Sequence, residues 1–214
     1  GAKWMREIDL HGSKVFVLPV IKGLVSEREK VRSAILEVRP EAVGISISRE
    51  ELEGLRAYGG EEIELSELEE AYSAGLQEFG EVQLPPPCYL EALKVAGELG
   101  IPIIPLDMNE ELFSDRYCEL IGGLELVKES FFSRRIARKR FDMESAESFV
   151  LDYDRKVNGG RGLSTLNQER EAHMASASID ALGSRRSLLI TVELERYEGF
   201  ASELERHYST RDDK

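Results

Sequence analysis

The sequence predicts an α/β fold with a mainly parallel or mixed central sheet, helices on both faces and a helical insertion. Short apolar runs alternate with helical patterns, as in sheets whose strands are joined by crossover helices. The run 187–194 (SLLITVEL) is almost continuously apolar, which is typical of a strand covered on both faces. Residues 110–157 show helical patterns without a strand, which predicts an insertion or lid.

The first half of the chain supplies three of the predicted strands, at 15–21 (VFVLPVI), 42–47 (AVGISI) and 101–106 (IPIIPL). Pro19 cannot donate a hydrogen bond, so the first strand is expected at an edge, bulged, or ending near Leu18. The intervening helices are expected to begin at serine–glutamate capping boxes, in which each side chain accepts a hydrogen bond from the other residue's backbone. These boxes are Ser26–Glu29, Ser48–Glu51 and Ser66–Glu69.

Two further helices are marked by their ends. Pro87 suits the first turn of a helix that closes at Gly100, and Asn109 is expected to cap the helix that follows the third strand. Within 110–157 we predict two or three helices, with breaks near Gly122-Gly123 and Phe141-Asp142.

The last part of the chain predicts a loop, a helix, a strand and a terminal helix. Residues 158–162 (NGGRG) read as a flexible loop, and Thr165 with Gln168 predicts a helix that begins near Leu166. Apolar residues at spacings of three and four place Arg170 on or beside the buried stripe of that helix. The strand at 187–194 and a helix through about His207 then complete one domain of residues 1–214.

Composition restricts the function. A net charge of −13 argues against nucleic-acid binding, which needs a positive surface. No apolar run is long enough for a transmembrane segment, and Cys88 and Cys118 match no metal or redox spacing, so we expect a cytoplasmic protein. The basic run 134–140 (RRIARKR) indicates either an anionic partner or membrane surface, or a solvated helix face that balances the acidic surface.

The order of these pieces resembles the TraB family, named for the pheromone-shutdown proteins and related to the Tiki metalloproteases and erythromycin-esterase-like folds. The resemblance rests on residues 17–52, on 100–109 (GIPIIPLDMN), on 169–175 (EREAHMA) and on the closing LLITVELERYEGF. It implies an α/β domain with a metal-dependent hydrolase site built on two Gly-x-x-His motifs and a strand glutamate.

The chain departs from that pattern where the chemistry lies. Lys22 stands at the first histidine position, Ser46 at the glutamate position, and Arg196 nearest the second histidine. Of the family's site, Asp107, Glu169 and Arg170 match. A hydrolytic metal needs about three nitrogen or carboxylate ligands and an open coordination position, so we expect no metal and no cofactor.

Three hypotheses follow from the candidate residues. The first is an inactive, ligand-binding or regulatory module for a small molecule or peptide, with Arg170 and His173 among its binding residues. Lys22, Ser46 and Arg196 would form a new anion site in its cleft, or else mark a cleft that is no longer used. The second is a hydrolase of altered chemistry that uses Asp107 and Glu169 for acid–base or metal-ligand roles. The third is a scaffold that forms a homodimer through residues 110–157.

Each candidate also has a structural interpretation. Arg170 is also consistent with a structural ion pair to Asp107, and Asp107 with a loop cap that accepts hydrogen bonds from backbone donors. His173 follows Glu169 by four residues and so shares its helix face, which permits metal ligation but also fits a lone, half-buried histidine.

Overall fold

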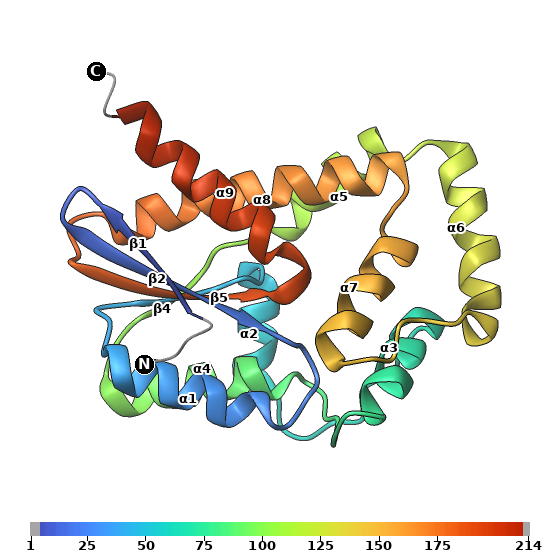
Figure 1. The fold of residues 1–214 in the computed structure, drawn as a ribbon, viewed down its shortest axis with the longest axis horizontal. Helices are drawn as coiled ribbons and strands as arrows, with labels where there is room; N and C mark the ends of the chain where they lie inside the picture. The colour runs from blue at the N-terminus through green and yellow to red at the C-terminus, as the bar shows by residue number, and fades with distance from the viewer. Residues whose placement is uncertain (1–4, 212–214) are drawn as a thin grey trace.

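The computed structural model describes residues 5–211, so both ends of the predicted domain 1–214 lie outside the described residues. It contains a five-stranded, mostly parallel sheet with helices packed around it, in the order β1-β2-β5-β3-β4 (Figure 1). The first pair, β1–β2, is antiparallel, and the other three pairs are parallel. The predicted fold class is therefore confirmed. The strands are β1 (Arg6–Leu10), β2 (Ser13–Val20), β3 (Val43–Ile45), β4 (Ile103–Pro105) and β5 (Ser187–Glu193).

Helices cover both faces of the sheet. On one face lie α1 (Glu27–Val38) and α4 (Pro87–Leu99), and on the other lie α8 (Arg161–Leu182) and α9 (Leu194–Arg211) (Figure 1). Side chains alternate along a strand, so the central strand β5 contributes to both cores. Leu189 packs in the core with α1 and α4, whereas Leu188 and Ile190 pack in the core with α8 and α9.

The remaining helices include those of the expected insertion. They are α2 (Arg49–Ala57), α3 (Glu67–Gln77), α5 (Glu110–Leu120), α6 (Gly123–Arg135), the 3-10 turn η1 (Ile136–Arg138) and α7 (Ala146–Val157). The predicted breaks within 110–157 are confirmed. A third apolar cluster, with Phe149 of α7 and Leu76 of α3 fully buried, joins two of these helices. As a result α3, α6 and α7 lie together beyond the end of β5 from which α9 leaves the sheet (Figure 1).

Most of the predicted helix ends are confirmed. The side chains of Ser48, Ser66 and Asn109 accept hydrogen bonds from the backbone N–H groups three residues later, and Ser66–Glu69 forms the complete capping box, whereas Ser48–Glu51 forms only its serine half. Pro87 occupies the first turn of α4, and Gly100 closes that helix with φ +67°, in the left-handed region that favours glycine. These capping signals depend only on residues close in sequence, so they predict a helix end without knowledge of what the helix packs against.

Two predicted capping boxes are wrong. Ser26 makes no side-chain cap, and the carboxylate of Glu27 accepts a hydrogen bond from Ile21 N (3.2 Å) instead. Helix α8 begins at Arg161 rather than near Leu166, so the loop predicted over 158–162 is shorter than expected. A distant side chain starts this helix, because the Glu125 carboxylate of α6 accepts hydrogen bonds from the amides of residues 162 and 163 (3.0 and 3.2 Å).

The edge strand β1 was not predicted, because it has only five residues and three of them are charged. It pairs with β2 through a tight turn in which His11 and Gly12 have φ of +54° and +86°. The pairing of β1 with β2 ends at Arg6 and Val17. In the described part of the chain, the strand β2 at Pro19 therefore has a neighbour only on its β5 side, where it continues through Val20. Within residues 5–211, no helix combines the length and the apolar composition that crossing a bilayer requires.

Candidate functional site

The four parallel strands end at one edge of the sheet, where open α/β sheets place their ligands. Lys22 follows β2, Ser46 follows β3, Asp107 follows β4, and Glu193 is the last residue of β5. Together with Arg170 of α8, these side chains line a cavity of about 390 Å³, called here the polar chamber. Four residues that the sequence singled out, Lys22, Ser46, Asp107 and Arg170, are thus brought together.

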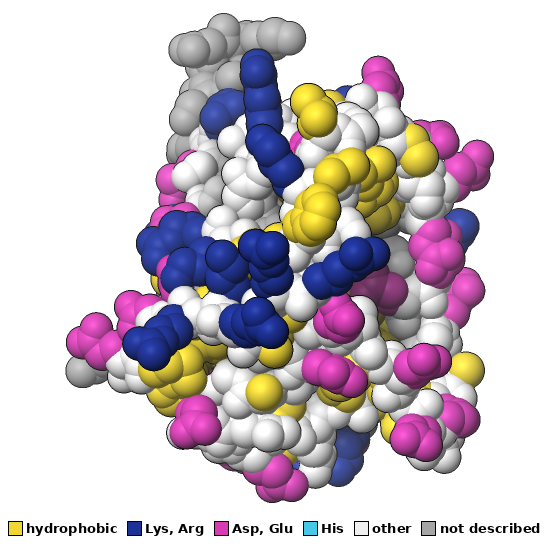
Figure 2. All heavy atoms as spheres, turned by 90° about the vertical axis from the view of Figure 1, so that its right-hand side faces the viewer, with side chains coloured by type: hydrophobic (Ala, Val, Ile, Leu, Met, Phe, Trp, Pro, Cys, Tyr) yellow, Lys and Arg dark blue, Asp and Glu magenta, His cyan; other side chains and the backbone are white. Residues whose placement is uncertain are grey.

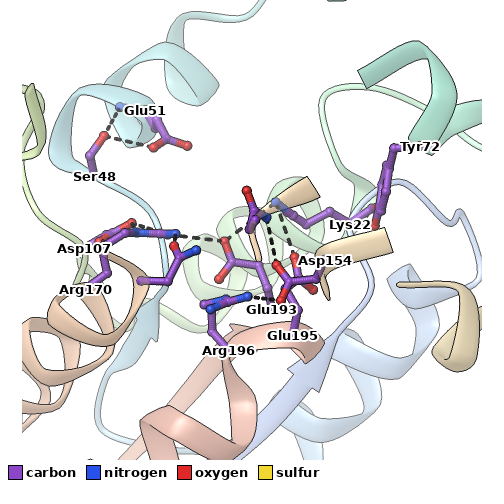
Figure 3. A network of polar contacts seen from close by, with 12 residues as sticks. Lys22, Ser48, Glu51, Tyr72, Asp107, Asp154, Arg170, Glu193, Glu195 and Arg196 are labelled. Atoms are coloured by element: carbon purple, nitrogen blue, oxygen red, sulfur yellow. Dashed lines mark hydrogen bonds and ion pairs between the residues drawn. The ribbon is translucent and has the colours of Figure 1, made fainter. Parts of the chain in front are cut away.

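Glu193 lies at the centre of this edge and was not among the predicted site residues. It is only 5% exposed, and its Oε1 is 3.9 Å from both the Lys22 Nζ and the Arg170 Nη2 (Figure 3). These separations exceed hydrogen-bond distance. Its other oxygen, Oε2, is buried and has no hydrogen-bond partner among the described residues. A buried carboxylate oxygen without a donor costs free energy, so this atom marks a place for one.

Arg170 and Asp107 form the ion pair that the structural interpretation anticipated. Arg170 Nη2 is 2.7 Å and Nε is 3.1 Å from Asp107 Oδ2, and Nη1 donates to Asn167 Oδ1 at 2.9 Å. Burial lowers the pKa of Arg170, but the charges of Asp107 and Glu193 outweigh it, so the net direction is upward. Arg170 is therefore a fixed cation whose hydrogen bonds are directed mainly at Asp107.

Lys22 is the second cation of the cleft. Its Nζ lies 3.9 Å from Glu193 Oε1 and 3.8 Å from Glu195 Oε1, while its side chain remains 36% exposed (Figure 3). Burial lowers the pKa of Lys22, and the carboxylates of Glu193 and Glu195 raise it by more. The hydroxyl of Tyr72 donates to the Lys22 backbone carbonyl at 2.8 Å, which fixes the turn that presents the ammonium group. Lys22 is thus charged and reachable from the cleft.

Glu51 adds a third carboxylate, from the first turn of α2. The Ser48 hydroxyl donates to Glu51 Oε1 at 3.3 Å, next to the helix cap that the same serine forms (Figure 3). The Glu51 side chain is open to solvent, yet the walls of the cleft surround its carboxylate. This burial, with the charges of Glu193 and Asp107, raises the pKa of Glu51.

A second cavity, of about 530 Å³, adjoins the first and is called here the apolar chamber. Both chambers are lined by Lys22, Glu51 and Glu193, so charged side chains form the boundary between them. The hydroxyls of Ser46 and Tyr89 lie near each other, but neither makes a hydrogen bond of normal geometry. The apolar lining of the second chamber comes from Ile47, Leu55, Ile63, Leu65, Leu84, Pro85 and Pro86.

Three predicted site residues do not line either chamber. Arg196 forms an ion pair with Asp154 of α7, which ties α9 to the insertion (Figure 3). Glu169 accepts two hydrogen bonds from Arg116 of α5, each of 2.8 Å, and these bonds lower the pKa of Glu169. His173 lies half-buried farther along α8. Asp107 and Glu169 are therefore each paired with a different arginine.

The metal that the TraB resemblance implies does not fit these residues. Within residues 5–211, no three His, Cys, Asp or Glu side chains are arranged to hold a metal ion. Lys22 and Arg170 instead direct two organic cations at Glu193. No protein-family model and no curated protein sequence matches this chain. The resemblance therefore stays a prediction based on motifs.

Proposed function

We propose that this chain is a binding protein whose cleft accepts a small organic amine with an apolar part, including the amino end of a peptide. In this proposal it is a diverged TraB-like protein without metal-dependent hydrolase activity. The observation that carries the proposal is Glu193 Oε2, which is buried at the boundary of the two chambers without a hydrogen-bond donor. A ligand N–H group would supply that donor.

The charge of the polar chamber favours a cationic ligand. Its lining contains the two cations Lys22 and Arg170, against four carboxylates. One of these, Asp107, is already bonded to Arg170. An ammonium group between Glu51 and Glu193 would offset the remaining negative charge and form charge-assisted hydrogen bonds. The four carboxylates belong to Glu51, Asp107, Glu110 and Glu193.

The neighbouring apolar chamber supports a ligand with an apolar portion. Both chambers fall within or near the volume range of small-molecule sites, and such sites combine apolar walls with a few convergent polar groups. A ligand that spans the boundary at Glu193 would place its ammonium group in the first chamber and its apolar group in the second.

The geometry supports the hydrolase hypothesis less well. Acid–base hydrolysis by Asp107 and Glu169 requires both carboxylates to reach one substrate. Glu169 lines neither chamber, and each carboxylate is bonded to an arginine. Binding is therefore the function that the cleft supports best.

Calorimetric titration with three leucine derivatives tests this proposal, because they share one apolar group and differ in charge. Leucinamide, which carries only the ammonium group, should bind at a ratio of one to one, and N-acetylleucine, which carries only the carboxylate, should not. Free leucine should bind more weakly than leucinamide. Glu193→Gln should weaken leucinamide binding by roughly tenfold or more, the usual value of a charged hydrogen bond.

Glu169→Gln is the matched control. It makes the same substitution at a carboxylate next to Arg170 on α8 that lines neither chamber. It should leave the affinity for leucinamide unchanged. Equal loss in both variants, or preferential binding of N-acetylleucine, would show that the proposed site is wrong. Release of leucine from leucinamide by the wild type, lost in Asp107→Asn, would establish the hydrolase instead.

A further inference from the structure

Helix α6 carries an apolar stripe that no other part of the described chain covers. Leu124, Val127 and Phe131 recur at helical spacing, so they share one face of the helix. They are 82%, 53% and 57% exposed, and no residue of α6 is buried. The helix forms one outer edge of the molecule (Figure 1). Single exposed apolar residues are common, but a stripe of three indicates a contact surface.

A cluster of cations follows the stripe directly. Arg134, Arg135, Arg138, Lys139 and Arg140 are all exposed. Within residues 5–211, none of these four arginines forms an ion pair, although the chain contains 41 acidic residues. Other arginines are paired with carboxylates, namely Arg6, Arg32, Arg116, Arg170 and Arg196. Lys139 lies over the Phe132 ring, with its Nζ 5.4 Å from the ring centroid, while the four arginines have no carboxylate of the described chain at ion-pair distance.

The stripe and the cations lie on one side of the molecule. Figure 2 shows that side, with Lys and Arg side chains gathered in a band across its middle, hydrophobic side chains next to them, and acidic side chains beneath the band and toward the margins. We call the stripe and the residues 134–140 together the α6 face. An anionic surface with an apolar layer beneath it would satisfy both of its components.

We propose that the α6 face docks on the surface of a lipid bilayer that contains anionic lipids. Helices that lie in the bilayer interface place Leu and Phe side chains among the acyl chains and Lys or Arg side chains at the headgroups. The cations would gain from the negative surface potential, and the stripe would gain from burial. The remaining surface of this chain is strongly acidic, so such a bilayer would repel it and favour one orientation.

The shape of the α6 face favours a bilayer over a protein partner. Leu124 and Phe131 project from an outer helix, whereas a partner helix is usually received in an apolar groove. The largest hollow nearby, of about 710 Å³, lies between α3 and the segment 133–143. Its lining combines Glu67, Glu70 and Glu78 with Arg134, Lys139 and Arg140 of the cluster, so an anionic protein segment that entered it would meet carboxylates as well as cations. The stripe itself stands outside that hollow.

Co-sedimentation with vesicles tests the proposal. The wild type should sediment with vesicles of phosphatidylcholine and about 30% phosphatidylserine, and not with phosphatidylcholine alone. Changing the three stripe residues to serine, or Arg135, Arg138 and Arg140 to glutamine, should each lower the partition coefficient by roughly tenfold or more. Because α6 buries no residue, both triple variants should keep the wild-type circular dichroism spectrum.

The matched control removes three positive charges elsewhere, at the exposed residues Arg56, Arg161 and Arg186. This variant should partition like the wild type. The proposal is overturned if the control loses as much binding as the cluster variant, or if the stripe variant binds normally. It is also overturned if the wild type does not sediment with phosphatidylserine vesicles, and sedimentation velocity would then show whether the stripe variant changes its oligomeric state. Such a change would identify a protein interface.

Discussion

Replacing Arg170 by methionine should remove a cation that donates hydrogen bonds to Asp107 and Asn167, and should destabilise the fold. The Arg170 and Asp107 side chains are 17% and 8% exposed, and their closest atoms are 2.7 Å apart. Removing one partner of a buried pair typically costs about 3–5 kcal/mol, because the other charge stays buried and unpaired. Methionine fills part of the space, so we expect the free energy of unfolding to fall by about 3 kcal/mol.

Arg116→Met is the matched control for this change. Arg116 binds Glu169 through two hydrogen bonds of 2.8 Å, but these side chains are 27% and 34% exposed. Exposed pairs contribute about 0–1 kcal/mol, so this variant should lose less than about 1 kcal/mol. The two variants remove the same side chain from pairs of similar geometry and differ mainly in burial.

Urea unfolding followed by circular dichroism measures both losses, with the slope against urea expected to stay constant. A double-mutant cycle with Asp107→Asn should give a coupling energy above about 1 kcal/mol. Equal losses in Arg170→Met and Arg116→Met, or additive effects in the cycle, would refute the claim that Arg170 is held in a desolvated pair.

Two further predictions concern the helices around the cleft. A β-carbon added at Gly75 of α3 would overlap the Phe149 ring, so Gly75→Ala should lower the free energy of unfolding by about 2 kcal/mol. Gly97 of α4 has open space around it, so Gly97→Ala should raise the free energy of unfolding by about 0.5–1 kcal/mol. Differential scanning calorimetry measures both changes. Hydrogen bonds from two neighbouring cations of α7 lower the pKa of Asp152 to about 2, so its ionised form stabilises the protein above the usual Asp pKa. Asp152→Asn should therefore lose about 1–2 kcal/mol near neutral pH, and urea unfolding at several pH values should show this loss shrinking as the pH falls toward 2.

The sequence predicted most helix ends and brought out four residues that share the polar chamber, but it missed Glu193. Lys22 and Ser46 were singled out because they stand at the histidine and glutamate positions of the TraB resemblance, and Asp107 also because it follows a strand at the edge where open α/β sheets place ligands. Glu193 was missed because its importance depends on the central place of β5 between β2 and β3, which is a non-local fact. Its position at the end of the most apolar run was the available signal.

Helix periodicity had a similar limit. The pattern placed Arg170 on or beside the buried stripe of α8, but it did not say which residues Arg170 and its neighbour Glu169 would meet. Arg116 reaches Glu169 from α5, distant in sequence, and leaves Arg170 to meet Asp107. The start of α8 was likewise set by a side chain of α6 rather than by the local Thr165–Gln168 signal.

Parallel calorimetric titrations of the wild type and Glu193→Gln with leucinamide and with Mn²⁺ test the role of Glu193 most directly. If Lys22 and Arg170 supply the cations of the cleft and Glu193 accepts a ligand ammonium group, leucinamide binds the wild type, the variant loses that binding, and Mn²⁺ gives no heat of binding in either protein. Stoichiometric Mn²⁺ binding by the wild type that disappears in Glu193→Gln would contradict this account.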